Sequence, residues 1–167
     1  MLKLERFELE LHRDLIDPLT ALLHEAYAPL AAKGMKYLAT HQPPAETLKR
    51  LQQGESYLAF SSGELVGSIT LYKPRPAGLC EYYRKDGVLS FGQFAIKLSL
   101  QGRGYGSSMM TLIETRAKEL GALELALDTS EHAEDLIRMY EKRGYKHVSY
   151  TQWEVTNYRS VILTKFL

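Results

Sequence analysis

The chain has 167 residues, with 21 basic and 20 acidic side chains, so its formal net charge is only +1. Nucleic-acid-binding domains usually carry a clear basic excess, and this balance therefore argues against a nucleic-acid partner. With 45% hydrophobic and 25% charged residues the composition is that of an ordinary globular protein of one-domain size, so we predict a single domain over 1–167.

The cysteine content and the N-terminal residues bear on the compartment. Cys80 has no second cysteine to pair with and no neighbouring histidine to activate it, so we expect a quiet small residue. The N-terminal segment mixes polar and apolar residues, unlike a secretory signal peptide, and no apolar run reaches the length of a membrane span. We therefore predict a cytoplasmic protein without a membrane partner.

The first third of the chain predicts one strand and two helices. Apolar and polar residues alternate over Leu4–Leu11, as in a half-buried strand. Asp17 and Pro18 suit the N-cap and the first position of a helix, whose apolar stripe continues until Gly34 ends it. A shorter helix is predicted over Ala45–Gln52.

The middle of the chain predicts a hairpin and a further strand. Two strands, Tyr57–Ser61 and Glu64–Tyr72, flank the turn dipeptide Ser62-Gly63. A loop rich in proline and glycine follows over Lys73–Gly87, and a third strand is predicted over Val88–Ile96.

Helices and strands alternate after this point. A long amphipathic helix is predicted from about Gly104 to Leu120, with Gly121 at its C′ position. A short strand over Glu124–Asp128 leads into another amphipathic helix over 133–143, which Gly144 ends.

Two final strands, over about Tyr145–Tyr150 and Ser160–Phe166, complete the order. A meander of strands followed by crossover helices predicts an α/β fold of the α+β type, with a mixed, mostly antiparallel sheet. The strands on either side of the long helix should be parallel neighbours, because a helical crossover connects them.

The most informative segment is a glycine-rich turn that joins a strand to the long helix, Gln101-Gly102-Arg103-Gly104-Tyr105-Gly106. Free backbone N–H groups and the positive end of the helix dipole bind anions, and glycines let the backbone approach a phosphate closely. A turn with a purely local role is the alternative. The Gly-Lys-Ser/Thr of a P-loop is absent, and a dinucleotide fingerprint would need a third glycine where Ser107 stands.

The turn resembles the acetyl-CoA signature of the GNAT superfamily of N-acetyltransferases, Gln/Arg-x-x-Gly-x-Gly/Ala, and matches it at every position. Met139-Tyr140 and Gly144-Tyr145 resemble the family's Leu/Met-Tyr-x-x-x-Gly-Phe/Tyr ending, one strand later, as in the family. The resemblance covers about Val88 to Tyr145 well. It implies a GNAT-like fold, splayed at the acetyl-CoA strand, with acetyl-CoA as co-substrate and no metal.

The resemblance also implies which residues bind acetyl-CoA. Backbone N–H groups from Gln101 to Ser107 would hold the pyrophosphate, and the backbone at the strand end would pair with the pantetheine arm. Arg103 would either contact a phosphate or remain solvated. The implied set is Phe94, Ala95, Ile96, Gln101, Gly102, Arg103, Gly104, Tyr105, Gly106 and Ser107.

Acetyl transfer from a thioester to an amine needs a neutral amine, a donor to the developing oxyanion and a donor to the sulfur. The resemblance assigns the Phe94 N–H to the oxyanion and Tyr140 to the sulfur, the alternative for Tyr140 being a core tyrosine. Because a phenol near pKa 10 is a weaker acid than a thiol near 8.5, we expect Tyr140 to act mainly as a hydrogen-bond donor.

The general base is less defined. Asp128 ranks first, because it ends the strand that should diverge from the acetyl-CoA strand. Glu81, Glu131 and His132 are further candidates, and an amine with a lowered pKa needs no dedicated base.

The superfamily lines its acceptor cleft with three regions, here 34–41, 73–87 and 151–159. Aromatic loop residues suit a pocket for a small molecule or peptide. We expect Tyr37, Tyr83 and Trp153 to contact the acceptor.

These observations predict an acetyl-CoA-dependent N-acetyltransferase that acts on a primary amine of a small molecule, amino acid or peptide, by direct attack in a ternary complex. Two alternatives stay open. One is a non-catalytic acyl-CoA-binding or sensing module on the same fold, and the other is an α/β protein that binds a different anion or nucleotide. A homodimer is among the expectations for the oligomeric state.

Overall fold

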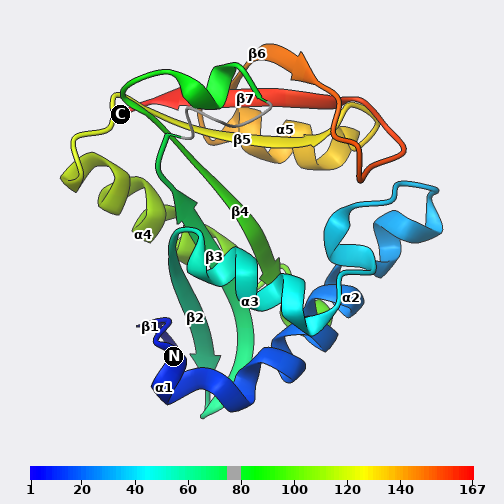
Figure 1. Ribbon diagram of the computed structural model, residues 1–167, viewed down its shortest axis with the longest axis vertical. Coiled ribbons are helices and arrows are strands. Elements are labelled where there is room, and N and C mark those ends of the chain that lie inside the picture. Colours follow the sequence, from blue (N-terminus) through cyan, green and yellow to red (C-terminus); the bar gives the residue numbers. More distant parts are fainter. Residues whose placement is uncertain (75–79) are drawn as a thin grey trace.

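The computed structural model describes residues 1–74 and 80–167, so residues 75–79 of the predicted loop lie outside the described part (Figure 1). The strands are β1 (Leu2–Arg6), β2 (Glu55–Ser61), β3 (Glu64–Tyr72), β4 (Val88–Ile96), β5 (Glu124–Ser130), β6 (Lys146–Thr151) and β7 (Ser160–Phe166). The helices are α1 (Leu9–His12), α2 (Ile16–Ala32), α3 (Pro44–Gln52), α4 (Tyr105–Glu119) and α5 (Glu134–Lys142), with short 3-10 turns between them.

One sheet contains the seven strands of the described residues, in the order β1-β2-β3-β4-β5-β7-β6. Strands β4 and β5 are parallel, and every other neighbouring pair is antiparallel. Helix α4 makes the crossover between the parallel pair. The predicted α+β fold, its mostly antiparallel sheet and its parallel pair are therefore confirmed.

The sheet opens between β4 and β5. Their pairing covers only Val88–Ser90 with Glu124–Ala126, whereas β3 stays paired with β4 as far as Ile96 and β7 stays paired with β5 as far as Ser130. The register of β3 and β4 shifts near Gln93, which has a φ of +45°. A bulge of this kind bends the strand that carries it. The two halves of the sheet diverge as a result and leave a wedge between β4 and β5 (Figure 1).

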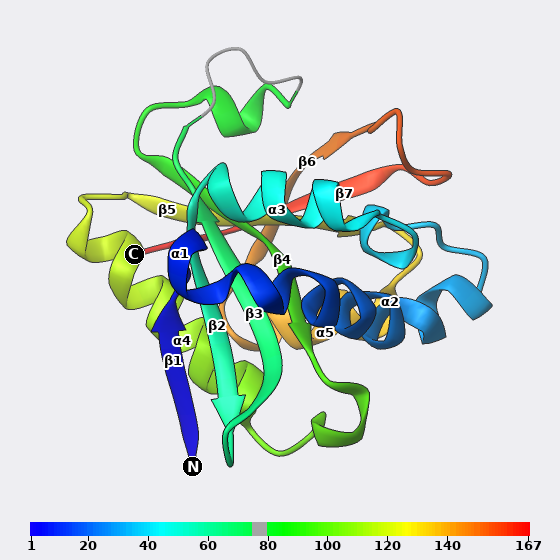
Figure 2. The ribbon, with the colours of Figure 1, turned by 60° about the horizontal axis from the view of Figure 1, so that its bottom comes forward.

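Helices cover both faces of the sheet, α2 and α3 on one side and α4 and α5 on the other (Figure 2). In β2, Leu58 is buried in one cluster with Leu19 of α2, while the next residue, Ala59, is buried in another with Met109 and Ile113 of α4. Because successive strand residues point to opposite faces, apolar residues at both positions are typical of a strand that is covered on both faces.

Most of the predicted turn and cap residues hold the positions expected of them. Ser62 and Gly63, between β2 and β3, both have positive φ, as a tight two-residue hairpin turn requires. Gly34, Gly121 and Gly144 follow α2, α4 and α5 with φ between +83° and +101°. These glycines end their helices in the left-handed conformation, as predicted.

The N-terminal segment differs from the prediction. The first strand ends at Arg6 rather than Leu11, because β2 begins at Glu55 and the last backbone bond to it comes from Phe7. Without a partner strand, the chain turns into α1. The predicted N-cap at Asp17 is also wrong, since α2 already begins at Ile16.

Candidate active site

The glycine turn before α4 keeps its backbone open to solvent. Gly102 and Gly104 have φ of +78° and +85°, in the left-handed region that residues with a Cβ rarely adopt. A Cβ added at either position would meet no atom within 4 Å. These glycines are therefore not required by protein packing, and they leave a concave backbone surface of the kind that holds phosphate oxygens.

The backbone N–H groups of this turn have no partners of their own. Within the described residues, no hydrogen bond is made by the N–H groups of Gly102–Ser107, and the next one, from Ser108, donates to the Gly104 carbonyl at 3.1 Å. The N–H of Gln101 donates to the Leu98 carbonyl at 3.3 Å, so the row of free donors starts one residue later than predicted. Free donors at a helix N-terminus form a site for an anion. The turn therefore fits the pyrophosphate of acetyl-CoA.

Side chains of the predicted acetyl-CoA set mostly hold the turn in place. The Gln101 Nε2 donates to the Ile96 carbonyl at 3.2 Å, which ties the turn to the end of β4. The hydroxyls of Tyr105 and Ser61 lie 3.1 Å apart, which ties the start of α4 to the β2–β3 hairpin. Arg103 is exposed, and no ion pair is found for it in residues 1–74 and 80–167. These contacts leave binding in this turn mainly to the backbone.

The outer edge of β4 faces the wedge. The Lys97 N–H donates to the Val66 carbonyl of β3 at 2.7 Å, and strand backbones alternate in direction. Ala95 therefore faces β3, while the backbone groups of Phe94 and Ile96 turn toward the side that β5 has left. This is the edge that the sequence analysis predicted for the pantetheine arm.

A central cavity of about 280 Å³ occupies the wedge, and Tyr140 of α5 is part of its wall. The Tyr140 ring packs against the rings of Phe91 and Tyr145, with centroids 6.3 and 5.9 Å away. Burial raises the pKa of Tyr140 well above its ordinary value of 10. Its hydroxyl makes no hydrogen bond within the part of the chain that the structure describes. The site thus holds a protonated phenol beside the cavity.

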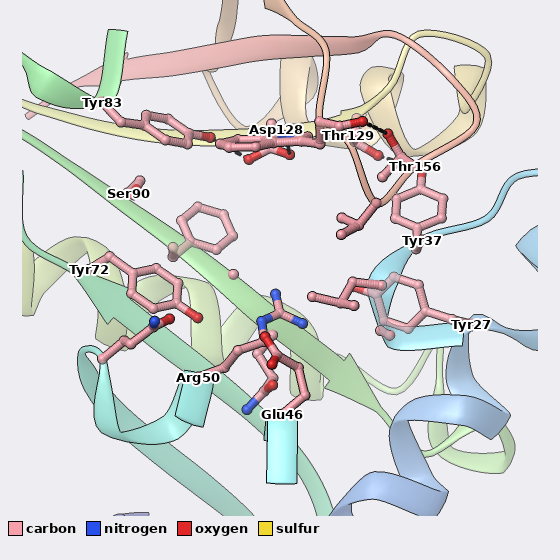
Figure 3. Close-up of a pocket in the computed structure, with 18 of the residues that line it drawn as sticks. Tyr27, Tyr37, Glu46, Arg50, Tyr72, Tyr83, Ser90, Asp128, Thr129 and Thr156 are labelled. Atoms are coloured by element: carbon pink, nitrogen blue, oxygen red, sulfur yellow. Dashed lines mark hydrogen bonds between the residues drawn. The ribbon is translucent and has the colours of Figure 1, made fainter. Parts of the chain in front are cut away.

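Three residues that the sequence singled out meet on the β5 side of the cavity. The Tyr83 hydroxyl donates to Oδ1 of Asp128 at 2.6 Å, and the Trp153 Nε1 donates to Oδ2 at 2.9 Å (Figure 3). Each carboxylate oxygen thus accepts a bond from an aromatic side chain. The two donors come from the middle loop and the last hairpin, so they fix the orientation of the carboxylate in the cavity wall.

A group of tyrosines forms another part of the wall. The Tyr37 ring packs against those of Tyr27 and Tyr158 in tilted arrangements, with centroids 5.3 and 4.9 Å away. The Tyr37 hydroxyl bonds the Thr129 hydroxyl at 2.7 Å and accepts the Ser130 N–H at 3.2 Å, and burial raises its pKa. Tyr37 therefore lines the cavity, its hydroxyl is already bonded within the protein, and its contact with the acceptor stays a prediction.

The wall opposite Asp128 contains residues that the sequence analysis missed. Arg50, in the last turn of α3, and Tyr72, at the end of β3, point into the cavity (Figure 3). Tyr27 of α2 also lines it and donates its hydroxyl to the Phe94 carbonyl at 2.8 Å. No local signal marks these residues, because a basic residue at a helix end and an aromatic residue in a strand are both ordinary.

The remaining base candidates do not line the central cavity. Glu131 pairs with Arg159 at 2.8 Å, and His132 and Glu81 are exposed. Cys80 is buried, and burial raises the pKa of its thiol, which suits the quiet role expected of it. Of the four candidates for the general base, Asp128 is the one that lines the central cavity.

Two absences apply to the described ranges. No cluster of three or more His, Cys, Asp or Glu residues there is arranged to hold a metal ion. Nor does any helix outside 75–79 combine the length and the apolar character needed to cross a membrane.

Comparison with known proteins identifies the family. The chain matches the model of the acetyltransferase (GNAT) family over residues 18–145, which include both the glycine turn and Tyr140. It is 28% identical over 142 residues to the S-(2-succino)cysteine N-acetyltransferase of Bacillus subtilis, which covers 84% of this chain and 83% of that protein.

Two further comparisons bear on the family and the fold. An uncharacterized N-acetyltransferase of B. subtilis, YvbK, is 29% identical over 96 residues, 58% of this chain and 56% of that one, so this alignment spans little more than half of the relative. A B. subtilis acetyltransferase solved in complex with CoA superposes with a TM-score of 0.70 at 21% identity, over 100% of this chain and 99% of that one.

Proposed function

The chain belongs to the GNAT family of N-acetyltransferases, which act with acetyl-CoA, and on that premise we propose that it acetylates a primary amine of a small molecule by direct attack in a ternary complex. The observation that carries the proposal is the wedge between β4 and β5. The edge of β4 that β5 leaves runs from the cavity wall at Phe91–Gln93, which Tyr140 shares, to the strand end at Ile96, to which Gln101 ties the glycine turn, and this supports the proposal.

Different residues of the chain bind different parts of acetyl-CoA, which supplies the acetyl thioester. The N–H groups of Gly102–Ser107 bind the pyrophosphate. The outward backbone of Phe94 and Ile96 binds the pantetheine arm, mainly through its N–H groups, because both carbonyls already accept side-chain hydrogen bonds. The Phe94 N–H donates to the acetyl oxygen. It follows the bulge at Gln93, and such bulges commonly occur beside active sites, where they re-aim the backbone.

Tyr140 donates a hydrogen bond in the proposed reaction, and Asp128 accepts a proton. The Tyr140 phenol donates a hydrogen bond to the sulfur, and its raised pKa keeps the proton in place. Asp128 faces the amine and accepts its proton, directly or through a water molecule. The cavity of about 280 Å³, lined by tyrosine rings and Trp153, suits a small amine. The relative that aligns over most of the chain is named for a cysteine derivative, which supports a small acceptor.

The first test is isothermal titration of the folded protein with acetyl-CoA, with ATP and NAD as controls, followed by an assay of CoA release with a panel of amines. We expect saturable binding of acetyl-CoA alone and turnover with a subset of amines. Binding without turnover on any amine would indicate the non-catalytic module, and preference for ATP or NAD would indicate a different anion site. The single domain over 1–167, the cytoplasmic location and the homodimer stay predictions.

A further inference from the structure

The central cavity has an acidic residue on its β5 wall and a basic residue, next to the acidic Glu46, on its α3 wall. Asp128 lies on the β5 wall, and Arg50 points into the cavity from the α3 wall (Figure 3). The proposed chemistry uses the Asp128 wall, at which the amine reacts. It assigns no role to Arg50, although a half-buried guanidinium in a substrate cavity is costly unless something in the cavity pairs with it.

Arg50 has no acidic partner in residues 1–74 and 80–167. Acidic residues pair with several other arginines there, and Glu46, one turn earlier in α3, pairs with Lys49 instead at 3.9 Å. Among the described residues, the side-chain hydrogen bond of Arg50 runs from Nη1 to the Oε1 of Gln42, a neutral amide, at 2.7 Å. No carboxylate of residues 1–74 and 80–167 therefore lies within ion-pair distance of the guanidinium, although Glu46 lines the same cavity beside Arg50 (Figure 3).

A buried network fixes this contact. Gln42 is fully buried, and its Nε2 donates to the Thr47 hydroxyl at 2.7 Å and to the Oε1 of Gln93 at 3.0 Å. The His24 Nε2 lies 2.7 Å from the backbone carbonyl oxygen of Gln42. Because both donors of the Gln42 amide are engaged, its oxygen must face Arg50. The guanidinium is thus held from behind in one orientation, as a preorganised binding group is.

The front of the guanidinium opens over Gly92 of β4. A Cβ at Gly92 would lie 3.6 Å from the Arg50 Nη2 and 3.2 Å from the Tyr72 ring. The absence of a side chain at this position leaves room beside Nη2 in the cavity. A planar guanidinium with free N–H groups matches the two oxygens of a carboxylate better than any other common anion-binding side chain does.

We propose that the acceptor is an amine that also carries a carboxylate, as an amino acid does, and that Arg50 binds this carboxylate while the amine faces Asp128. This inference rests on the proposed function and narrows its acceptor. Arg50 acts as a specificity residue, since it contacts the acceptor away from the reacting atoms. A polyamine would place a second positive charge against the guanidinium, and the site therefore rejects it.

The test compares matched acceptors on matched variants. Initial rates of CoA release are measured for the proteinogenic L-amino acids, for the amide of each, and for spermidine. The proteins are the wild type, Arg50→Met, Arg50→Lys and the control Lys49→Met. The control removes a cation from the next position of α3, where it is exposed and does not line the cavity. Acetyl-CoA titration and the thermal midpoint report whether each variant is folded.

We expect the wild type to prefer at least one amino acid over its amide by roughly tenfold or more in kcat/KM. Arg50→Met should lower kcat/KM for that acid by roughly the same factor, mainly by raising KM. For the amide, kcat/KM should stay within about twofold of the wild-type value. Arg50→Lys should recover part of the loss because it keeps the charge but not the planar fork. Lys49→Met should leave kcat/KM unchanged for both the acid and its amide.

Equal activity of the wild type on acids and amides, a preference for spermidine, or an equal loss on both substrates in Arg50→Met would overturn the inference. If Arg50→Met does not fold, the wild-type preference and Arg50→Lys decide the matter. A wild type that binds acetyl-CoA but acetylates no carboxylate-bearing amine overturns this inference alone. A wild type that does not bind acetyl-CoA overturns the proposed function itself.

Discussion

The glycine turn and the central cavity serve the same opening in the sheet with different groups. The turn offers the backbone N–H groups of Gly102–Ser107, which are neighbours along the chain. The cavity offers side chains from α2, α3, β3, β5 and the last hairpin, which are far apart in sequence. The turn is therefore a local structure, and the cavity exists only once the whole chain has folded.

This difference separates the expected effects of mutation. A change in the turn should alter the binding of acetyl-CoA, because that is what backbone N–H groups at a helix start recognise. A change in the cavity should alter turnover or the choice of acceptor and leave acetyl-CoA binding unchanged. A variant that mixes the two effects would show that the two regions are coupled.

The largest effect is expected for Tyr140→Phe, which removes the cavity hydroxyl and no hydrogen bond within the described residues. We expect kcat to fall roughly a hundredfold or more, because the loss of one hydrogen-bond donor to a developing charge costs about that much. The affinity for acetyl-CoA, measured by titration, should stay the same.

Tyr145→Phe is the matched control for Tyr140→Phe. Its ring is a neighbour of Tyr140, but its hydroxyl donates to Glu114 at 3.0 Å, away from the cavity. This variant should lose about 1 kcal/mol of stability and keep its turnover. Equal turnover in the two variants would remove Tyr140 from the mechanism.

The next effect is expected for Gly104→Val, which places a branched side chain on the open face of the turn. We expect the dissociation constant for acetyl-CoA to rise roughly tenfold to a hundredfold, because several charge-assisted bonds to the turn weaken together. Gly121→Val is the control at the other end of α4, since Gly121 has nearly the same φ, +83°, and equally free space. If both variants bind acetyl-CoA like the wild type, the turn does not hold the pyrophosphate.

A smaller effect is expected for Asp128→Asn, which keeps the size of the side chain but places an amide NH₂ against either the Tyr83 hydroxyl or the Trp153 Nε1, both of which donate to the carboxylate. We expect kcat/KM for the amine to fall by roughly tenfold or more, since a general base contributes at least this much. Steady-state kinetics with varied amine measure the effect, and the acetyl-CoA titration should not change. Unaltered kinetics would mean that the amine needs no base here.

The smallest effect concerns pH. Burial raises the pKa of Tyr140, so the phenol keeps its proton at a pH where an exposed tyrosine, with a pKa of about 10, would be half ionised. Turnover should therefore rise to a plateau as the amine loses its proton and show no decline up to about pH 10. A pH profile of kcat, with circular dichroism to confirm folding, tests this. A decline near pH 10 that Tyr140→Phe abolishes would mean that the pKa of Tyr140 is not raised.

Prediction from sequence succeeded where the signal was local. The hairpin at Ser62-Gly63, the parallel pair around α4 and the helix-ending Gly144 are as expected. It failed at Leu9–Leu11, whose alternating pattern is typical of a strand. A strand also needs a partner, and β2 does not extend far enough to provide one.

In the site too, local sequence signals identified single residues, and the fold decided which of them meet. Asp128, Tyr83 and Trp153 were each chosen separately, and the fold joins them through two hydrogen bonds. Arg50 and Tyr72 carry no local signal of a site. Their place in the cavity depends on how α3 lies against β4, which no single segment encodes.

The sequence by itself determined the strand–turn–helix unit around Gly104 and the family to which it points, because glycine conformation and hydrophobic periodicity act between close neighbours in the chain. Only the tertiary structure decided which charges face one another in the cavity. The splay of β4 from β5 and the burial of Gln42 behind Arg50 arise from packing between segments that lie far apart along the chain, and contacts of that range leave no pattern in any one of them.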